Sequence, residues 1–279
     1  MEEIKKGTLY LCPTPIGNLE DITIRTLNVL KNVDVIAAED TRHSLGLLNH
    51  FEIKKPLISY FEHNKFERGP ELVEKLLNGE SIALVTDAGT PAISDPGEDL
   101  VKLCIENAVE VVPLPGANAA ITALIASGIE TARFTFQGFL PAHKKERRER
   151  LEEVKNYPET LIYYEAPHKI KATLQSMQEV LGDRKICLCR ELTKRYEEFY
   201  PCLISEALER YKEEEPRGEF VIVVRGCENP ESADETADLS IEEIYENYLA
   251  RGVDFKEAIK LAAKDKGISK REAYDILKK

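Results

Sequence analysis

The chain has 279 residues, 43% of them hydrophobic, and a formal net charge of −12 at pH 7. This length and apolar content indicate a globular protein of about two domains and exclude a disordered chain. The net charge excludes a protein that binds nucleic acid over its whole surface. The apolar runs are too short to cross a bilayer and no secretory signal is visible, so we expect a cytoplasmic protein without a membrane segment.

Strand-like and helix-like segments alternate over the first 225 residues. A first block has strand patterns at 8–12, 33–38, 56–60, 82–86 and 109–114, and helix patterns at 23–32, 44–51, 71–78 and 100–107. A second block has strand patterns at 133–139, 160–165, 185–192 and 220–224, and helix patterns at 143–154, 168–181 and 205–211. The alternation predicts an α/β fold with mostly parallel strands. We expect two α/β domains, residues 1–115 and 116–226, with a cleft between them.

The composition changes after residue 226. Residues 227–239 are acidic and lack a large apolar residue before Leu239, which is typical of a linker. Residues 240–279 predict a small helical extension of helix–turn–helix type, because three capping signatures open three short helical patterns. Residues 255–279 hold eight Lys or Arg against four acids. This basic excess leaves two interpretations open, a dimerisation or lid bundle and a nucleic-acid contact.

Cysteine and histidine positions argue against a metal site. The six cysteines lie mostly in apolar strand patterns, so we expect reduced, structural thiols, at Cys12, Cys104, Cys187, Cys189, Cys202 and Cys227. The spacing of His43, His63 and His168 matches no metal motif, and we expect no metal.

Three loops rich in glycine and proline each follow a predicted strand, at residues 12–18, 86–97 and 113–120. In open α/β sheets, ligands bind beyond the carboxyl ends of the strands, so these loops can line one crevice. Glycine lets the backbone approach a ligand, and proline fixes the loop shape. The pattern predicts a small molecule held by main-chain groups, such as an adenine or an amino-acid moiety. The phosphate-binding, dinucleotide-binding and serine-nucleophile motifs are absent.

Charged clusters stand at four strand ends, at residues 38–44, 164–169, 189–199 and 216–220. Each cluster alone fits a set of caps and salt bridges at the rim of a sheet, whereas four together favour a shared site. The basic segment at residues 143–150 fits either a solvated helix face or a phosphate contact.

Seven segments carry a family resemblance. They read TPIGNLEDIT, AEDTRHS, DAGTPAISDPG, PGANAA, YEAPHK, CRELTK and GEFVIVV, in this order. Together they resemble the ribosomal RNA 2′-O-ribose methyltransferases of the tetrapyrrole methylase family, over about residues 7–224. The segment YEAPHK has Ala166 and Lys169 where Ser and Arg are commoner in that family, which is a mild departure. The resemblance implies two α/β domains around S-adenosylmethionine, a homodimer, and methylation of a decoding-centre cytidine in 16S (small-subunit) rRNA, naked or in the assembled small ribosomal subunit.

The resemblance also implies which residues bind the cofactor. The loop with Gly89, Thr90 and Ile93 would wrap its methionine part, and residues of the second domain would surround its adenosyl part. The full set of implied cofactor-binding residues is Pro15, Gly17, Asp87, Gly89, Thr90, Ile93, Ala117, Asn118, Tyr164, Glu165, Leu192 and Glu219.

A ribose hydroxyl is a poor nucleophile, so a proton acceptor or a cation beside it should help. We expect Asp40 or Glu191 to accept the proton, and Arg42 or Lys194 to contact the phosphate or the developing alkoxide. Three other interpretations stay open: a tetrapyrrole C-methyltransferase of the same fold, a nucleotide-sensing module without turnover, and an RNA-binding factor that uses only its helical tail.

Overall fold

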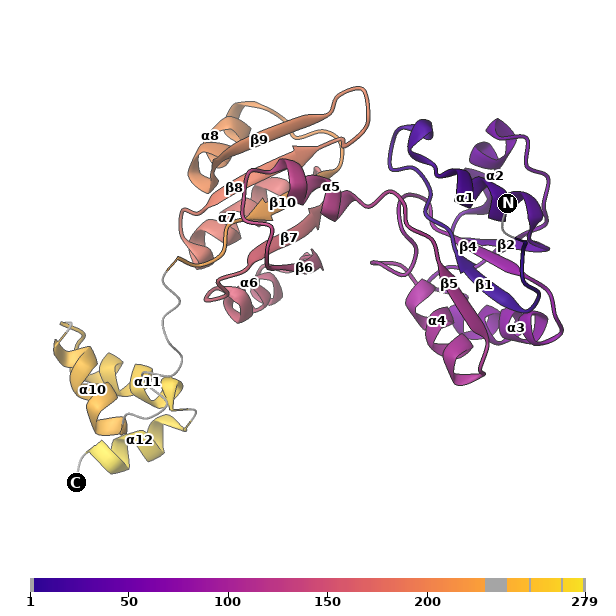
Figure 1. The fold of residues 1–279 in the computed structure, drawn as a ribbon. Coiled ribbons are helices and arrows are strands. Elements are labelled where there is room, and N and C mark those ends of the chain that lie inside the picture. Colours follow the sequence, from indigo (N-terminus) through magenta and orange to yellow (C-terminus); the bar gives the residue numbers. More distant parts are fainter. Residues whose placement is uncertain (1–2, 229–239, 251, 267, 278–279) are drawn as a thin grey trace. The chain divides into compact units, whose positions relative to one another are not determined.

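The structure is a computed structural model of the chain, and it describes residues 3–228, 240–250, 252–266 and 268–277. The chain forms two compact units. The larger unit comprises Met1–Lys155 with Glu159–Gly226, and the smaller comprises Asn156–Pro158 with Cys227–Lys279. The larger unit holds two five-stranded sheets, and we call their surroundings the first lobe (residues 8–113) and the second lobe (residues 119–224) (Figure 1). Both lobes are α/β, as the sequence predicts.

The first lobe has five strands, four helices and one short 3-10 helix among its described residues. The strands are β1 (Thr8–Leu11), β2 (Val35–Ala38), β3 (Leu57–Ser59), β4 (Ile82–Val85) and β5 (Glu110–Pro113). The helices are η1 (Leu19–Asp21), α1 (Ile24–Asn32), α2 (Thr41–His50), α3 (Lys65–Leu77) and α4 (Gly97–Glu106).

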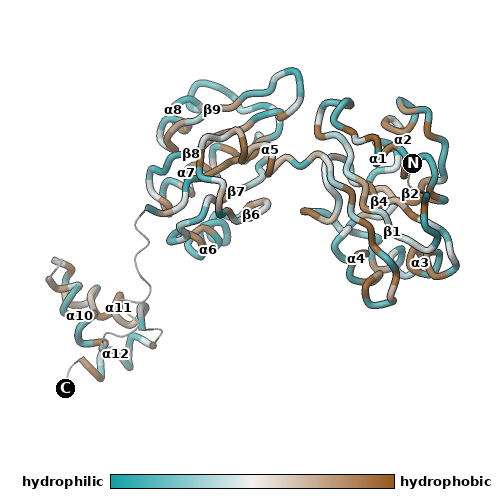
Figure 2. Tube along the Cα trace, in the orientation of Figure 1, coloured by the Kyte–Doolittle hydropathy of each residue, from teal (hydrophilic) through white to brown (hydrophobic). Residues whose placement is uncertain are grey.

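The sheet of the first lobe is parallel throughout, in the order β3-β2-β4-β1-β5. Every residue of β2 and β4 is buried, as expected for central strands that helices cover on both faces. Two apolar clusters fill these faces, and Figure 2 shows the apolar residues concentrated along the strands. Since all strands run in one direction, the loops after β1, β4 and β5 emerge at one edge from three adjacent strands.

The second lobe has five strands and four helices among its described residues. The strands are β6 (Phe134–Phe139), β7 (Thr160–Glu165), β8 (Lys185–Arg190), β9 (Glu198–Leu203) and β10 (Phe220–Val224). The helices are α5 (Ala119–Ala126), α6 (Lys144–Val154), α7 (Ile170–Leu181) and α8 (Ile204–Glu213).

The sheet of the second lobe is mixed, in the order β6-β7-β10-β8-β9. Strands β6 and β7 are parallel, whereas β10 runs antiparallel to both β7 and β8. Phe220 at the start of β10 pairs with Glu165 and with Arg190, which end β7 and β8. Three connections therefore meet at one edge of this sheet: the loop after β7, the loop between β8 and β9, and the loop before β10.

The described residues of the smaller unit form three helices, α10 (Ile241–Ala250), α11 (Phe255–Asp265) and α12 (Lys270–Leu277). A small apolar cluster that includes Ile244 and Ile259 joins them. Ser240 with Glu243, and Ser269 with Glu272, form the reciprocal capping bonds that the sequence predicts. Residues 229–239 of the expected linker lie outside the described residues, and the domain boundaries expected from the sequence stay a prediction.

No helix in the described part of the chain is long and apolar enough to cross a membrane. The six cysteines are free, and four of them are buried. Cys187 and Cys189 project from one face of β8 with their sulfur atoms 3.7 Å apart. Among the described residues, no group of three or more His, Cys, Asp or Glu side chains is placed to hold a metal ion.

Candidate active site

The three glycine- and proline-rich loops that follow β1, β4 and β5 are joined by hydrogen bonds and close packing. The backbone N–H of Thr14 donates to Gly89 O at 2.9 Å, and the N–H of Gly89 donates to Thr14 O at 3.0 Å. Thr90 Oγ1 donates to Ala117 O at 2.8 Å, which ties the second loop to the third. A Cβ on Gly116 would lie 2.5 Å from Pro13 Cβ, so the first and third loops pack closely because residue 116 is a glycine. The loops form one surface, as the sequence predicts.

The loop after β4 is held in an unusual backbone conformation. Gly89, Ala92 and Ser94 have φ angles of 85°, 68° and 66°, in the left-handed region that non-glycine residues rarely adopt. The Oδ1 atom of Asp95 accepts hydrogen bonds from the N–H groups of Ala92 and Gly97, at 2.9 and 2.8 Å. Strained residues that persist in this way concentrate at ligand-binding segments. The loop therefore has the backbone expected of a ligand clamp.

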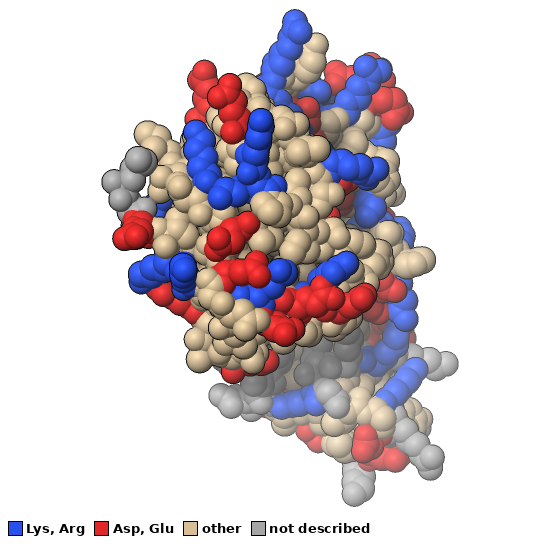
Figure 3. Space-filling model, turned by 90° about the vertical axis from the view of Figure 1, so that its right-hand side faces the viewer, with Lys and Arg blue, Asp and Glu red and all other residues tan. Residues whose placement is uncertain are grey.

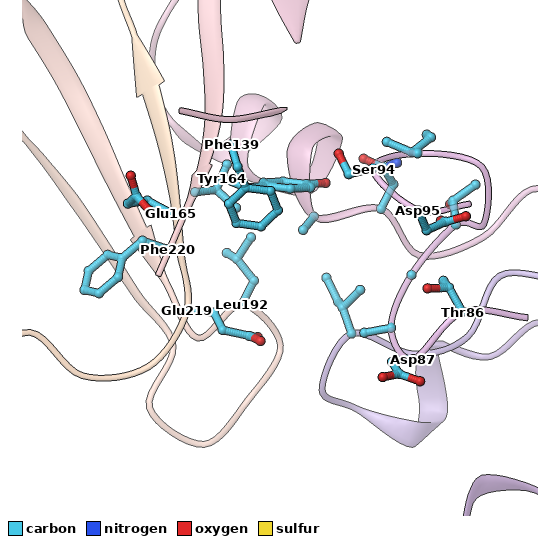
Figure 4. Close-up of a pocket in the computed structure, with 18 of the residues that line it drawn as sticks. Thr86, Asp87, Ser94, Asp95, Phe139, Tyr164, Glu165, Leu192, Glu219 and Phe220 are labelled. Atoms are coloured by element: carbon cyan, nitrogen blue, oxygen red, sulfur yellow. The ribbon is translucent and has the colours of Figure 1, made fainter. Parts of the chain in front are cut away.

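A cavity of about 560 Å³ lies between this loop and the second lobe. Thr86, Asp87, Ser94 and Asp95 lie on one side of it, and Tyr164, Leu192 and Glu219 face them from the second lobe (Figure 4). The volume is within the range of about 300–1,000 Å³ that small-molecule and cofactor sites occupy. It is therefore large enough for a cofactor.

The aromatic part of the wall comes from the second lobe. The ring of Tyr164 makes edge contacts with Phe136 and Phe139, at centroid distances of 4.9 and 5.6 Å. The N–H of Ala120 donates to Tyr164 Oη at 3.2 Å, which holds the start of α5 against β7. Burial raises the pKa of Tyr164, so its hydroxyl stays neutral. The result is a fixed apolar surface beside the polar loop.

Most of the cofactor-binding residues expected from the sequence line the cavity. Nine of them do so: Asp87, Gly89, Thr90, Ile93, Asn118, Tyr164, Glu165, Leu192 and Glu219. Pro15, Gly17 and Ala117 are not among the lining residues, although Ile16 between the first two is. Their roles toward a cofactor stay predictions.

Of the four residues expected to act in catalysis, Lys194 lines the cavity, and Asp40, Arg42 and Glu191 do not. Asp40 is the N-cap of α2, and both its oxygens accept hydrogen bonds from the Arg42 side chain, at 3.2 and 2.8 Å. The hydrogen bond from the Arg42 side chain lowers the pKa of Asp40 to about 2, and the pair is exposed. The side chains of Asp40 and Arg42 therefore form an ion pair with each other, away from the cavity lining.

Lys194 lies in an ion-pair network of the second lobe. Its Nζ donates to Glu219 Oε2 at 2.7 Å and to Glu191 Oε1 at 3.0 Å, and Glu191 Oε1 also accepts from the N–H of Glu219. Burial by itself would lower the pKa of Lys194, but the two carboxylates outweigh it and raise that pKa. Lys194 is therefore a permanent cation at the wall of the cavity.

Sequence reasoning missed Glu39, which lines the cavity. Thr86 Oγ1, at the end of β4, donates to Glu39 Oε2 at 2.7 Å and so fixes the carboxylate against the first lobe. Glu39 lies in the AEDTRHS segment, directly before Asp40, so the sequence points to this segment but not to this acid. Ser94, Asp95 and Phe139 also line the cavity and were not expected there.

The charge of the cavity wall is negative. Its lining includes the five carboxylates Glu39, Asp87, Asp95, Glu165 and Glu219 against one cation, Lys194. Glu165 is buried and satisfied by Thr173 Oγ1 and the N–H of Ala166, at 2.6 and 2.9 Å. A wall with this excess of negative charge favours a ligand that carries positive charge.

The basic segment at residues 143–150 is engaged within its own lobe. Lys144 and Arg148 on α6 pair with Glu179, while Lys145 and Arg150 pair with acids of α6 itself. Arg147 is buried and donates to Ser176 Oγ and to two carbonyl groups. The solvated, ion-paired helix face is therefore the better of the two interpretations of this segment. Basic and acidic side chains are also interspersed on the face that Figure 3 shows.

Comparison with known proteins decides the family. The sequence model of the family Tetrapyrrole (Corrin/Porphyrin) Methylases matches residues 8–208, which cover the first lobe and most of the second. The chain belongs to the tetrapyrrole methylase family. The family to which the seven sequence segments point is thereby confirmed.

Curated relatives match almost the whole chain. Ribosomal RNA small subunit methyltransferase I of Bacillus subtilis (strain 168) is 53% identical over 272 residues, which cover 96% of this chain and 93% of that protein. The protein of the same name from Synechocystis sp. is 44% identical over 271 residues, 97% of each chain. The chain is therefore an S-adenosylmethionine-dependent methyltransferase.

Solved structures share the fold. Diphthine synthase matches with a TM-score of 0.63 and 13% identity, covering 78% of this chain and 90% of that one. Uroporphyrin-III C-methyltransferase from Thermus thermophilus, complexed with S-adenosylhomocysteine, matches with a TM-score of 0.55 and 17% identity, covering 77% and 96%. At these identities the likeness establishes the fold of the two lobes.

The cavity residues suit S-adenosylmethionine. The strained, glycine-containing loop could offer backbone groups to the amino-acid part of the cofactor, and the rings of Tyr164 and Phe139 would offer an apolar surface to its nucleoside. The acidic wall suits the positive charge of a sulfonium and an ammonium group. Gly89, Thr90, Asn118 and Tyr164 would hold the cofactor from both lobes.

Proposed function

We propose that the chain transfers a methyl group from S-adenosylmethionine to the ribose 2′-hydroxyl of a decoding-centre cytidine in 16S rRNA. The observation that carries the proposal is the extent of the similarity: relatives named ribosomal RNA small subunit methyltransferase I are 44–53% identical over 96–97% of this chain. Because at most 4% of the chain lies outside this match, it extends over most of both lobes and most of the smaller unit. The structures of tetrapyrrole methyltransferases are only 15–18% identical, so they support the fold and not their substrates.

S-adenosylmethionine, when bound, supplies an electrophilic methyl group. The chain must place a ribose hydroxyl in line with that group and take up its proton, and well-oriented reactants gain on the order of 7–11 kcal/mol in this way. We propose that the Glu39 carboxylate accepts the proton of the ribose hydroxyl, because Glu39 lines the cavity and the Thr86 hydroxyl fixes its position. Lys194, held as a cation by Glu191 and Glu219, would stabilise negative charge on the hydroxyl oxygen or on a phosphate.

Asp40, the acceptor expected from the sequence, is the natural control for Glu39 because the two acids are adjacent in the chain. Glu39→Gln removes the basic carboxylate but keeps an oxygen that can accept from Thr86. We expect kcat to fall about 10²- to 10⁴-fold, as is typical when a general base is removed, with S-adenosylhomocysteine affinity unchanged within about threefold. Asp40→Asn, which retains a good N-cap, should keep kcat within about threefold.

Single-turnover transfer of a labelled methyl group and calorimetry with S-adenosylhomocysteine provide these measurements. Normal turnover of Glu39→Gln together with a large loss in Asp40→Asn would return the role to Asp40. Normal turnover of both variants would remove both acids from the reaction.

The acceptor itself is tested by offering alternatives. We expect transfer to small ribosomal subunits purified from cells that lack this protein, and no transfer to uroporphyrinogen. Mass mapping of the labelled rRNA should then place the methyl group on the ribose of one cytidine. Transfer to uroporphyrinogen would support the tetrapyrrole C-methyltransferase instead, and cofactor binding without transfer to any acceptor would support a nucleotide-sensing module.

Several partners follow from the proposal and stay predictions with it. The substrate is 16S rRNA, as naked RNA or in the assembled small subunit, and the protein would act in the cytoplasm as a homodimer. The three helices of the smaller unit are the predicted additional RNA contact, because residues 255–279 carry a net charge of +4, eight Lys or Arg minus four Asp or Glu.

A further inference from the structure

The loop between β8 and β9 combines a cavity-lining end with an exposed tip. Leu192 and Lys194 line the cavity. Tyr196, two residues further, is 65% exposed, which is unusual for a large aromatic residue. The Cα atoms of Lys194 and Tyr196 can be at most about 7.6 Å apart. The backbone of the exposed tip therefore lies close to a residue of the cavity wall.

The tip of this loop is held rigidly. The N–H groups of Lys194 and Glu197 donate to the carbonyls of Glu191 and Lys194, at 3.0 and 3.1 Å, and Glu197 Oε1 accepts from the N–H of Thr193. Glu191 and Thr193 adopt φ angles of 50° and 64°, a conformation that these bonds maintain. The loop is thus shaped before any ligand arrives, which reduces the entropy lost on binding.

The loop is also anchored to the first lobe. The N–H of Asn18 donates to Thr193 Oγ1 at 3.0 Å, and Gly17 packs directly against Leu192, Thr193 and Lys194. The tip of the β8–β9 loop is therefore fixed relative to the loop at residues 12–18.

Arg195 and Tyr196 form a pair at this tip. The Arg195 guanidinium lies over the Tyr196 ring, 5.6 Å from its centroid, and both side chains are exposed. In the part of the chain that the structure describes, no carboxylate is within ion-pair distance of Arg195. The basic residues of α6 differ, because acids or carbonyl groups engage them. An exposed aromatic ring beside a cation is the arrangement that binds an unpaired nucleotide, with the base on the ring and the phosphate on the cation.

Resting on the proposed function, we propose that Arg195 and Tyr196 are the contact for an unpaired nucleotide of the RNA substrate, next to the nucleotide whose ribose enters the cavity. Two further basic residues support an RNA path along this edge of the second sheet. Lys169 follows the lining residue Pro167, and Arg217 precedes the lining residue Glu219. Their strand ends are neighbours of the β8 end, since Phe220 pairs with both Glu165 and Arg190.

The proposal is tested by the KM for small ribosomal subunits that lack the methylation, measured with Tyr196→Ala, Tyr196→Phe and Arg195→Ala in the full chain. We expect Tyr196→Ala to raise KM roughly tenfold to a hundredfold, as loss of one stacked base does, and Tyr196→Phe to restore it. Arg195→Ala should raise KM and reduce the slope of log KM against log salt by about 0.7–0.9, because one phosphate contact is lost. The S-adenosylhomocysteine affinity and the single-turnover rate at saturating subunits should not change.

Two exposed residues elsewhere serve as matched controls. Phe66→Ala removes an aromatic side chain that is 84% exposed on α3, and Arg148→Ala removes a cation that is paired on α6. Neither should change KM. An unchanged KM and an unchanged salt slope in Tyr196→Ala and Arg195→Ala would overturn the proposal. A changed oligomeric state in light scattering, with normal affinity for subunits, would also overturn it, because the Tyr196 ring would then belong to an interface between copies of the chain. If the wild-type protein does not methylate subunits, the proposed function itself fails, which is a different result.

Discussion

The two walls of the cavity are built by different means. The first lobe contributes loops that follow parallel strands, and main-chain hydrogen bonds such as those between Thr14 and Gly89 determine their shape. The second lobe contributes side chains at one edge of a mixed sheet, where Lys194 joins Glu191 to Glu219. A backbone wall can be altered by a single methyl group, whereas a side-chain wall is altered by loss of charge or of a ring. Substitutions of glycine therefore test the first wall most sharply.

Among the glycine substitutions, the largest effect is expected where the two walls touch. A Cβ on Gly17 would lie 2.7 Å from Thr193 Oγ1 and 3.0 Å from Leu192 O, and it would also meet Lys194 Cγ. Gly17→Ala must therefore displace the β8–β9 loop with Lys194, and small misplacements of this kind can reduce rates about 10²-fold. We expect kcat/KM for small subunits to fall by that factor, with far-ultraviolet circular dichroism unchanged.

Gly46→Ala is the matched control for Gly17→Ala. Gly46 lies inside α2 and has nothing within 4 Å of an added Cβ, so the substitution should stabilise the protein by roughly 0.5–1 kcal/mol and leave kcat/KM unchanged. Nearly normal kcat/KM for Gly17→Ala would show that the two walls are not in close contact in solution.

The next effect separates backbone strain from ligand contact. Gly89 and Gly79 have similar φ angles, 85° and 91°, so an alanine at either position should cost about 1–2 kcal/mol of unfolding free energy. Only Gly89 lines the cavity, and its added Cβ would lie 3.2 Å from Ile16 Cγ2. We expect Gly89→Ala to weaken S-adenosylhomocysteine binding about tenfold in calorimetry and Gly79→Ala to leave it unchanged. Equal affinities for the two variants would argue against cofactor recognition by this backbone.

The first wall was the more predictable of the two. Glycine and proline at strand ends report directly on backbone shape, so the loops at residues 12–18, 86–97 and 113–120 could be assigned to one crevice. Parallel strands require that their carboxyl ends share an edge, and this rule places the loops without knowledge of any side chain. The sequence therefore predicted the surface and most of its lining.

The second lobe was harder to predict. The sequence does not indicate strand β9, because Pro201 and neighbouring charged residues are unusual in a strand. The structure explains why β9 can contain a proline, since β9 is an edge strand. One helix of the first lobe was also harder to predict: α3 begins at Lys65, before Gly69 and Pro70, which look like a helix boundary in the sequence. Pro70 has no N–H to donate to the carbonyl of Phe66, so the helix continues through this position with one hydrogen bond fewer.

In the sequence, only a cap preference distinguishes Glu39 from Asp40. The two acids stand where β2 passes into α2, so a rotation of one residue decides which side chain faces the cavity. Asp40 is the N-cap of α2, and aspartate is favoured over glutamate at that position. A cap preference is visible in sequence, and it could have indicated Glu39 as the acid left for the site.

The smallest expected effect tests whether the third loop acts through its helix or directly. Asn118 caps α5 by accepting from the N–H of Ile121 at 3.1 Å, and it also lines the cavity. Thr23 caps α1 in the same way, accepting from the N–H of Thr26 at 3.0 Å, but it does not line the cavity. Asn118→Ala and Thr23→Ala should each lower the unfolding free energy by about 1 kcal/mol in urea titrations. Asn118→Asp should restore the cap.

Cofactor affinity then separates the two roles of Asn118. If the amide contacts the cofactor, both Asn118→Ala and Asn118→Asp should weaken S-adenosylhomocysteine binding by roughly three- to tenfold, although only the first loses the cap. If Asn118 acts only by holding α5, affinity should fall in Asn118→Ala and recover in Asn118→Asp, because the helix start is then intact. Recovered affinity in Asn118→Asp would mean that Asn118 supports the wall by capping α5 and does not itself contact the cofactor. Thr90, whose hydroxyl donates to the carbonyl of Ala117, would then be the side chain that fixes the third loop beside the cofactor.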